Sequence, residues 1–312
     1  MVKERESLFK VHKRKVEAVK NVSLEIKEGK IVGLLGINGA GKTTTIKMLT
    51  TLLSPTSGSY YLDEIDAVKN PMIVKNRINM VAGGERMIYW RLTAYENLWY
   101  YGQIYGIENN VLKERIDKLL AIVGLSEKAN VPVETFSKGM KQRLQIARGL
   151  INNPQYLFMD EPTIGLDAVV AKELREHVRN LAKKEHKGIL LTSHYLEEIE
   201  ELCDYIYILN KGQLIKQGTV EELARDTFSQ RNYILSFYES YVGIAEKMEA
   251  YLRQYDESVV VERQDSQMKI TCIHNISKGL SEICAKEGLL IKEMYEQKPN
   301  LEDTILKIAK EA

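Results

Sequence analysis

A glycine-rich segment near the N-terminus carries residue types that bind phosphate. Gly36–Thr43 reads Gly-Ile-Asn-Gly-Ala-Gly-Lys-Thr and lies between an apolar run typical of a strand, Ile31–Leu35, and a helical pattern, Thr44–Leu52. Glycines at this spacing let backbone N–H groups surround an anion, and a helix N-terminus adds a partial positive charge. A glycine-rich turn with a coincidental Lys-Thr pair is the alternative, but the flanking strand and helix disfavour it. The segment predicts a site for a nucleoside triphosphate.

The same segment predicts what its side chains do. Lys42 is expected to reach the β- and γ-phosphates, and the Thr43 hydroxyl is expected to bind Mg2+. We expect the nucleotide to contact Gly36, Asn38, Gly39, Ala40, Gly41, Lys42, Thr43 and Thr44.

Two adjacent carboxylates follow another apolar run. Asp160 and Glu161 come directly after Tyr156–Met159. At the carboxyl edge of a parallel sheet, Asp160 can hold Mg2+, partly through water, and Glu161 can act as general base on the attacking water. Acids often cap strand ends, so this pair alone is weak evidence for a catalytic site. Together with the phosphate-binding segment it predicts hydrolysis of the triphosphate.

Three further motifs stand in the order found in one family of ATPases. Ser137–Met140 (Ser-Lys-Gly-Met) lies just before a helical pattern, Gly165–Asp167 follows the acidic pair, and Thr192–His194 follows another strand pattern. They resemble the signature motif, the D-loop and the switch-histidine segment of ABC transporter ATPases. Residues 1–220 as a whole resemble the nucleotide-binding subunit of such a transporter.

This resemblance implies a head-to-tail dimer with two ATP molecules bound between protomers. Ser137 and the N–H of Gly139 would grip the γ-phosphate bound to the other protomer, and Asp167 would lie at the same site. His194 would contact the γ-phosphate and help hold the water. Taken alone, Ser137 fits a simple helix N-cap and a histidine at a strand end is usually structural. The order of the motifs favours the functional interpretation.

The chain departs from the family pattern in two places. Where the family has a glutamine near Mg2+ and the water, this sequence has Gly83, Gly84 and Glu85. Either hydrolysis proceeds without that side chain or Glu85 substitutes through water; a flexible turn is the alternative. For the aromatic residue that stacks on adenine, His12 stands at about the expected place and Phe9 is the other candidate, with core packing its simpler role.

The alternation of strand and helix patterns up to about residue 220 predicts the fold class. It predicts α/β architecture with helices on both faces of a sheet. The expected strands are Ile31–Leu35, Tyr156–Met159, Ile189–Leu191 and Tyr205–Leu209, and the expected helices include Val111–Val123, Gln142–Leu150 and Val169–Glu185. Val22–Ile26 and Tyr60–Leu62 predict an antiparallel β portion beside the first helix. The resemblance implies a P-loop NTPase of the ABC type, with a mixed sheet and a helical subdomain.

After Gly218 the pattern changes to that of a small α+β unit, so we expect domains at 1–220 and 221–312. Its expected strands are Tyr233–Phe237, Ser258–Val261 and Lys269–Ile273, and its expected helices are Val220–Arg225, Gly243–Leu252, Ser277–Lys286 and Leu301–Lys310. Pro299–Asp303 (Pro-Asn-Leu-Glu-Asp) resembles a pattern in exporter ATPases for drugs, lipids or polysaccharides. Glu302 and Asp303 are interpreted as helix-start acids, which the helix dipole favours.

Composition and charge limit the remaining possibilities. The 312 residues include 44 Lys+Arg and 43 Asp+Glu, so the formal net charge of +1 predicts no nucleic-acid partner. No apolar run is long enough for a spanning helix, the charged N-terminus does not resemble a secretory signal, and three scattered cysteines suit a reducing cytosol. Together with these features, the resemblance to ABC transporter ATPases implies a cytoplasmic ATPase subunit of an exporter, peripheral on the inner face of the membrane, with a separate permease as partner.

The sequence also indicates where that permease would dock. Aromatic and apolar residues are dense for a surface helix at Tyr89, Trp90, Tyr95, Leu98, Trp99, Tyr100, Tyr101 and Tyr105. Some must be core, and a few are expected to line the docking groove.

A non-transport ABC ATPase acting on nucleic acid or ribosomes is the alternative function, although the second nucleotide domain, the coiled coil and the basic arm that are usual in such proteins are absent from the sequence. A P-loop kinase or GTPase is disfavoured, because such proteins lack the signature motif and the switch histidine that this sequence contains.

Overall fold

The computed structural model describes residues 2–7, 10–14, 17–82, 87–227, 230–239, 243–264, 267–297 and 301–311. Contacts between residues divide the chain into two compact units, Met1–Thr219 and Val220–Ala312. No helix in these described ranges has the length and apolarity that a transmembrane span requires.

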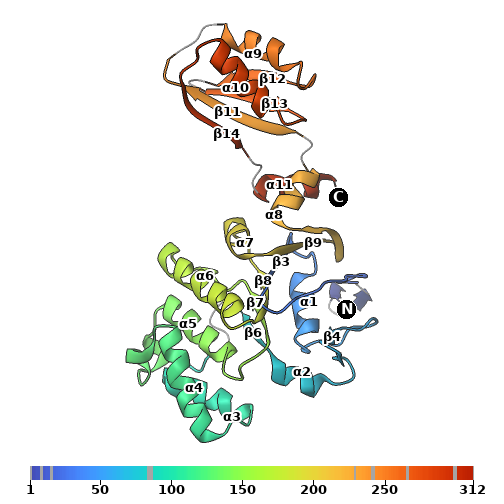
Figure 1. Ribbon diagram of the computed structural model, residues 1–312. Helices are drawn as coiled ribbons and strands as arrows, with labels where there is room; N and C mark the ends of the chain where they lie inside the picture. Colours follow the sequence, from blue (N-terminus) through green and yellow to red (C-terminus); the bar gives the residue numbers. More distant parts are fainter. Residues whose placement is uncertain are drawn as a thin grey trace. The chain divides into compact units, whose positions relative to one another are not determined.

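The first unit is built on a six-stranded sheet in the order β10-β9-β3-β8-β7-β6 (Figure 1). The strands are β3 (Ile31–Gly36), β6 (Ile78–Ala82), β7 (Tyr156–Asp160), β8 (Gly188–Thr192), β9 (Tyr205–Asn210) and β10 (Gln213–Gly218). β10 runs antiparallel to β9, and the other neighbours pair in parallel. The central strands β3, β7 and β8 are buried almost throughout, as continuous apolar runs predict for a sheet covered on both faces. The predicted mixed α/β fold is confirmed.

Helices cover both faces of this sheet. α1 (Lys42–Leu49) and α2 (Pro71–Arg77) bury Ile46 and Val74 against Val32, Leu34 and Phe158 of one face. On the other side of the strands lie α6 (Ala168–Lys183) and α7 (Leu196–Leu202) (Figure 1). The predicted helical subdomain consists of α3 (Ala94–Ile104), α4 (Asn109–Ile122) and α5 (Lys138–Gly149), which contact one another. Ser126–Lys128 and Val133–Thr135 form short 3-10 turns near them.

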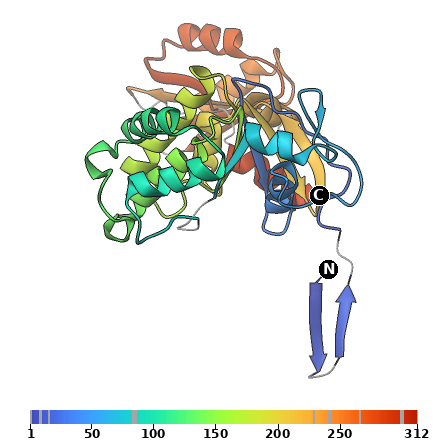
Figure 2. The same cartoon turned by 90° about the horizontal axis from the view of Figure 1, so that it is seen from below.

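The antiparallel β portion is confirmed at Tyr60–Leu62 but not at Val22–Ile26. β4 (Tyr61–Leu62) pairs antiparallel with β5 (Ile65–Asp66), and a separate hairpin of β1 (Val2–Ser7) and β2 (Lys10–Arg14) is visible in Figure 2. The strand predicted at Val22–Ile26 is wrong. Its side chains do alternate between half-buried and exposed, but the segment forms no ladder with any described strand. Alternation of apolar and polar residues predicts which side chains are buried, but a β-strand also needs a neighbouring segment with which to form hydrogen bonds.

The second unit has a βαββαβ order. It contains β11 (Arg231–Phe237), α9 (Ile244–Leu252), β12 (Val260–Gln264), β13 (Gln267–Cys272), α10 (Ser277–Lys286) and β14 (Ile291–Gln297). The sheet order β12-β13-β11-β14 with antiparallel neighbours is that of a ferredoxin-like fold. α9 and α10 bury Met248, Leu252 and Leu280 against Leu235 and Ile270 of the sheet. Before and after this fold, α8 (Val220–Thr227) and α11 (Leu301–Glu311) pack together.

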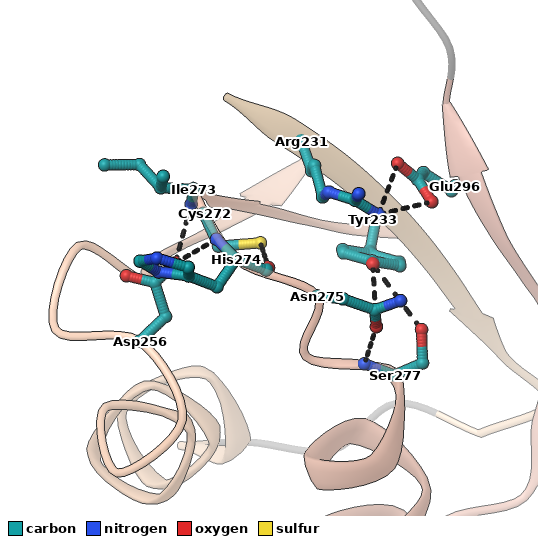
Figure 3. A network of polar contacts seen from close by, with 9 residues as sticks. All are labelled: Arg231, Tyr233, Asp256, Cys272, Ile273, His274, Asn275, Ser277 and Glu296. Carbon is teal, nitrogen blue, oxygen red and sulfur yellow. Dashed lines mark hydrogen bonds and ion pairs between the residues drawn. The ribbon is translucent and has the colours of Figure 1, made fainter. Parts of the chain in front are cut away.

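A buried carboxylate fixes the turn between β13 and α10 (Figure 3). Asp256 Oδ1 accepts hydrogen bonds from the amide and hydroxyl of Ser258, and its Oδ2 accepts from the amides of Ile273 and His274. The carboxylate is therefore satisfied on both oxygens by its own unit, which assigns it a structural role.

Candidate active site

The phosphate-binding segment forms a tight loop between β3 and α1. Gly41 is the N-cap of α1 with φ 103°, so no capping side chain covers the first N–H groups of the helix. A Cβ atom on Gly36 would lie 2.4 Å from the carbonyl oxygen of Leu209, which excludes any other residue there. The loop thus presents free backbone donors at a helix N-terminus, the arrangement that binds phosphate.

Lys42 lies inside this loop. Its side chain is buried, and Nζ donates hydrogen bonds to the carbonyl oxygens of Gly36 at 2.6 Å and Ile37 at 3.4 Å. Burial lowers the pKa of Lys42, while the nearby charges of Glu161 and Asp160 partly oppose that shift. The ammonium is therefore held at the loop, within the field of both carboxylates.

Oxygen atoms gather where β7 and β8 end. Asp160 and Thr192 are partners in the parallel ladder, and the Thr192 hydroxyl donates to Asp160 Oδ1 at 2.6 Å. Across from them, the Thr43 hydroxyl lies 3.4 Å from Asp160 Oδ2. This donor set of a carboxylate and a hydroxyl suits Mg2+, which binds oxygen and completes its octahedron with water and phosphate oxygens. The residues present therefore fit the ion.

Glu161 and His194 meet at the same edge of the sheet. Nε2 of His194 lies 2.6 Å from Oε1 of Glu161. The Glu161 amide donates to the carbonyl and hydroxyl oxygens of Thr192, at 3.0 and 3.1 Å. Its backbone has φ 54°, in the left-handed region that residues other than glycine rarely adopt. The carboxylate is thus aimed by a fixed, strained backbone.

The signature and D-loop residues both occupy helix starts. Ser137 is the N-cap of α5, and its hydroxyl accepts from the amide of Met140 at 3.2 Å. Asp167 is the N-cap of α6, and its Oδ1 accepts from the amide of Val170 at 3.0 Å. Both hydrogen bonds agree with the simple capping interpretation.

Some predicted residues lie outside the described parts of the structure. Gly83, Gly84 and Glu85, the segment in place of the family's glutamine, are among them. So are Phe9 and the side chain of His12. Pro299 and Asn300 are as well, whereas Glu302 and Asp303 stand in the first turn of α11.

The aromatic residues expected at the docking surface divide into two groups. Leu98 is fully buried and belongs to the core. Tyr89, Trp90 and Tyr100 are exposed. The rings of Tyr89 and Tyr100 meet edge to face with centroids 4.9 Å apart, and Lys141 Nζ lies 4.6 Å from the Trp90 ring centre. Tyr95, Trp99, Tyr101 and Tyr105 are half-buried.

One residue of the site was not assigned from the sequence. Thr192 contacts Asp160 through its hydroxyl and Glu161 through both its oxygens, so it orients both acids. The available signal was a hydroxyl at the end of a strand whose parallel neighbour ends in Asp160. This signal can be interpreted only when β7 and β8 are known to be neighbours in the sheet.

The comparisons with known proteins agree with this geometry. The sequence model of the ABC transporter family matches residues 19–164. The ABC transporter ATP-binding protein NatA of Bacillus subtilis is 44% identical over 227 residues, which are 72% of this chain and 92% of that protein. The bacitracin transport ATP-binding protein BcrA of Bacillus licheniformis is 35% identical across 94% of this chain and 92% of its own. A dimeric structure of a bacterial ABC transporter cassette matches with a TM-score of 0.60 at 25% identity, covering 70% of this chain and 96% of that one. The chain belongs to the ABC transporter family, as an ATP-binding and ATP-hydrolysing subunit.

Proposed function

We propose that Glu161 is the general base of ATP hydrolysis and that His194 positions it. The observation that carries this proposal is the 2.6 Å approach of His194 Nε2 to Glu161 Oε1, beside the Asp160 and Thr43 oxygens. In this scheme Glu161 takes a proton from the water that attacks the γ-phosphorus. The bond from that phosphorus to the bridging oxygen then breaks, and ADP and phosphate result.

The remaining residues of the site hold the nucleotide. The backbone amides of the loop, with Gly39, Ala40 and Gly41, surround the phosphates, and Lys42 neutralises β- and γ-oxygens. Thr43 and Asp160 would hold Mg2+, which when bound offsets the negative charge of the phosphates.

We also propose a head-to-tail dimer. In it, Ser137 and the N–H of Gly139 from one protomer contact the γ-phosphate held by its partner, and Asp167 lies near the same interface. The Gly139 amide, in the first turn of α5, would supply the anion-binding donor. The dimeric cassette structure similar to this chain supports the dimer itself.

The transport partner in this proposal is a separate membrane permease, bound on its cytoplasmic side. We place its contact at the exposed Tyr89, Trp90 and Tyr100, because aromatic side chains are enriched in interfaces. We also propose that the transporter is an exporter; BcrA, whose name refers to bacitracin transport, matches across 94% of this chain. We propose residues 1–220 as the ATP-binding domain and 221–312 as an accessory domain; the boundary between the compact units lies at Thr219 and Val220.

Two measurements test this proposal. The purified chain should hydrolyse ATP only with Mg2+ present, and chelation should abolish turnover. Replacement of Tyr89 and Tyr100 by Ala should release the chain from membranes that contain its permease, while its ATP hydrolysis in solution persists. Metal-independent hydrolysis would refute the assigned Mg2+ site, and unchanged membrane binding would refute the assigned contact.

A further inference from the structure

A second carboxylate, Glu198, is buried behind the catalytic pair and has no part in the scheme above. It lies in the first turn of α7 and is 3% exposed. Burying a carboxylate is unfavourable unless hydrogen bonds compensate. Burial raises the pKa of Glu198, and hydrogen bonds from Ser193 and Thr163 only partly oppose that shift. The folded protein therefore retains the Glu198 carboxylate at this position although its burial is energetically unfavourable.

Glu198 connects the two chain segments that carry the catalytic pair. The Thr163 hydroxyl donates to Glu198 Oε2 at 2.8 Å, and the Ser193 hydroxyl donates to the same oxygen at 2.5 Å. Thr163 follows Glu161 by two residues, and Ser193 directly precedes His194. Both hydroxyl residues are themselves buried. One carboxylate oxygen thus joins the segment leaving β7 to the segment leaving β8.

The connection continues into the segment that carries His194. The Ser193 hydroxyl also accepts a hydrogen bond from the amide of Tyr195 at 3.0 Å, so hydrogen bonds hold the residues on both sides of His194. The His194 side chain itself remains half exposed. The hydrogen bonds on both sides of His194 therefore restrict its backbone beside Glu161.

A simpler account of Glu198 is that acids are favoured in the first turn of a helix by the dipole. Glu197 lies in the same turn and is exposed to solvent. It can supply that interaction without any burial cost. The dipole accordingly does not explain why the neighbouring carboxylate points inward onto two hydroxyl groups.

We infer that Glu198 is a positioning residue for hydrolysis: by joining Thr163 to Ser193 it holds Glu161 and His194 at hydrogen-bonding distance. This inference rests on the proposed roles of Glu161 and His194. Glu198 does not touch the nucleotide in this scheme, so it contributes to the chemical step and leaves ATP binding to the loop.

The first test is the steady-state kinetics of Glu198→Ala in the full chain. We expect kcat to fall about tenfold or more with KM for ATP within about threefold, because small misplacements of catalytic groups slow chemistry strongly. Glu198→Gln keeps an oxygen that can accept both hydroxyl groups, so it should recover most of that loss. Glu197→Gln removes the exposed charge of the same turn and should match the wild type. A kcat within twofold of wild type for Glu198→Ala would overturn the inference.

A double mutant separates positioning from general damage. In the Glu161→Gln background the base is already lost, so adding Glu198→Ala should leave the residual turnover nearly unchanged. An equal further fall in that background would mean that Glu198 acts on the fold as a whole, which contradicts the inference.

Variants of the two hydroxyl residues test the inference if Glu198→Ala does not fold. Thr163→Val removes the hydrogen bond to Glu198, and Ser193→Ala removes both the bond to Glu198 and the bond from the Tyr195 amide. Neither change removes a charge, and each should lower kcat more than it raises KM. Unchanged kcat in both would refute the inference. If Glu161→Gln alone hydrolysed ATP near the wild-type rate, the proposed role of Glu161 would fail instead, so the two failures are distinguishable.

Discussion

Nε2 of His194 and Oε1 of Glu161 lie 2.6 Å apart at the ends of two parallel strands that are direct neighbours in the sheet. Glu161 reaches this position with a left-handed backbone, a conformation that costs roughly 1–3 kcal/mol in a residue other than glycine. The Thr192 oxygens, which accept both hydrogen bonds of the Glu161 amide, hold the backbone there. Such strain persists only where the surroundings enforce it, and it is typical of functional sites.

The first prediction concerns the base itself. Glu161→Gln should keep ATP affinity but lower turnover by about 10²-fold or more, because the amide cannot accept the proton of the water. It should also accumulate an ATP-bound dimer, visible by size-exclusion chromatography with light scattering. Hydrolysis near the wild-type rate would show that another group is the base.

The second prediction concerns the phosphate loop. Lys42→Ala should weaken ATP binding itself, because the loop loses the cation that we propose contacts the β- and γ-phosphates. Titration with a fluorescent ATP analogue measures this. Lys47→Ala provides the matched control, since Lys47 is an exposed lysine in the last turn of the same helix. Equal affinities for the two variants would remove Lys42 from the site.

The local motifs were readable from the sequence because each combines its residues within a few positions. The loop at Gly36–Thr43 and the acids Asp160 and Glu161 stand at the ends of strands that were predicted to within two residues. By contrast, the helix expected from Gln142 begins at Lys138. Gly139 weakens the helical pattern there, and the Ser137 cap compensates.

What the sequence could not reveal depends on contacts between distant segments. β14 (Ile291–Gln297) was missed because it is an edge strand, exposed along nearly its whole length, and shows no alternation. Its identity as a strand comes from its pairing with β11. In the same way, the role of Glu198 depends on Thr163, which lies 35 residues away in the chain.

The third prediction concerns the stability of the second unit. Each oxygen of Asp256 accepts two hydrogen bonds, so Asp256→Asn must turn an amide toward one pair of donors. We expect a loss of roughly 1–3 kcal/mol in the free energy of unfolding of this unit at neutral pH. Calorimetry of the full chain measures it. An unchanged unfolding transition would contradict the structural role of Asp256.

The same residue gives a pH dependence with a defined sign. Burial would raise the pKa of Asp256, but the hydrogen bonds from His274, Ser258 and Ile273 outweigh it and hold the pKa well below the ordinary 3.8. A lowered carboxyl pKa stabilises the folded state fully above the unfolded value, and this contribution is lost as the pH falls below it. The wild type should therefore lose stability below about pH 4 more steeply than Asp256→Asn. Parallel slopes would show that other groups control the acid transition.

The fourth prediction separates a shared dimer site from a site within one chain. Ser137→Arg should leave ATP binding to the monomer nearly intact, because Lys42, Thr43 and Asp160 all come from the chain that holds the phosphates. It should abolish ATP-driven dimerisation, since a bulky cation would fill the space meant for the partner's γ-phosphate. Full ATPase activity of Ser137→Arg alone would favour an unpaired P-loop enzyme.

Mixing two inactive variants tests the head-to-tail arrangement directly. When Ser137→Arg chains are combined with Lys42→Ala chains, one site of the mixed dimer carries both changes. The other site carries neither, because its phosphate loop comes from the Ser137→Arg chain and its signature segment from the Lys42→Ala chain. ATPase activity should therefore return on mixing, at no more than half the wild-type rate because each mixed dimer has one intact site. If each site were built from a single chain, the mixture would remain only as active as the separate variants.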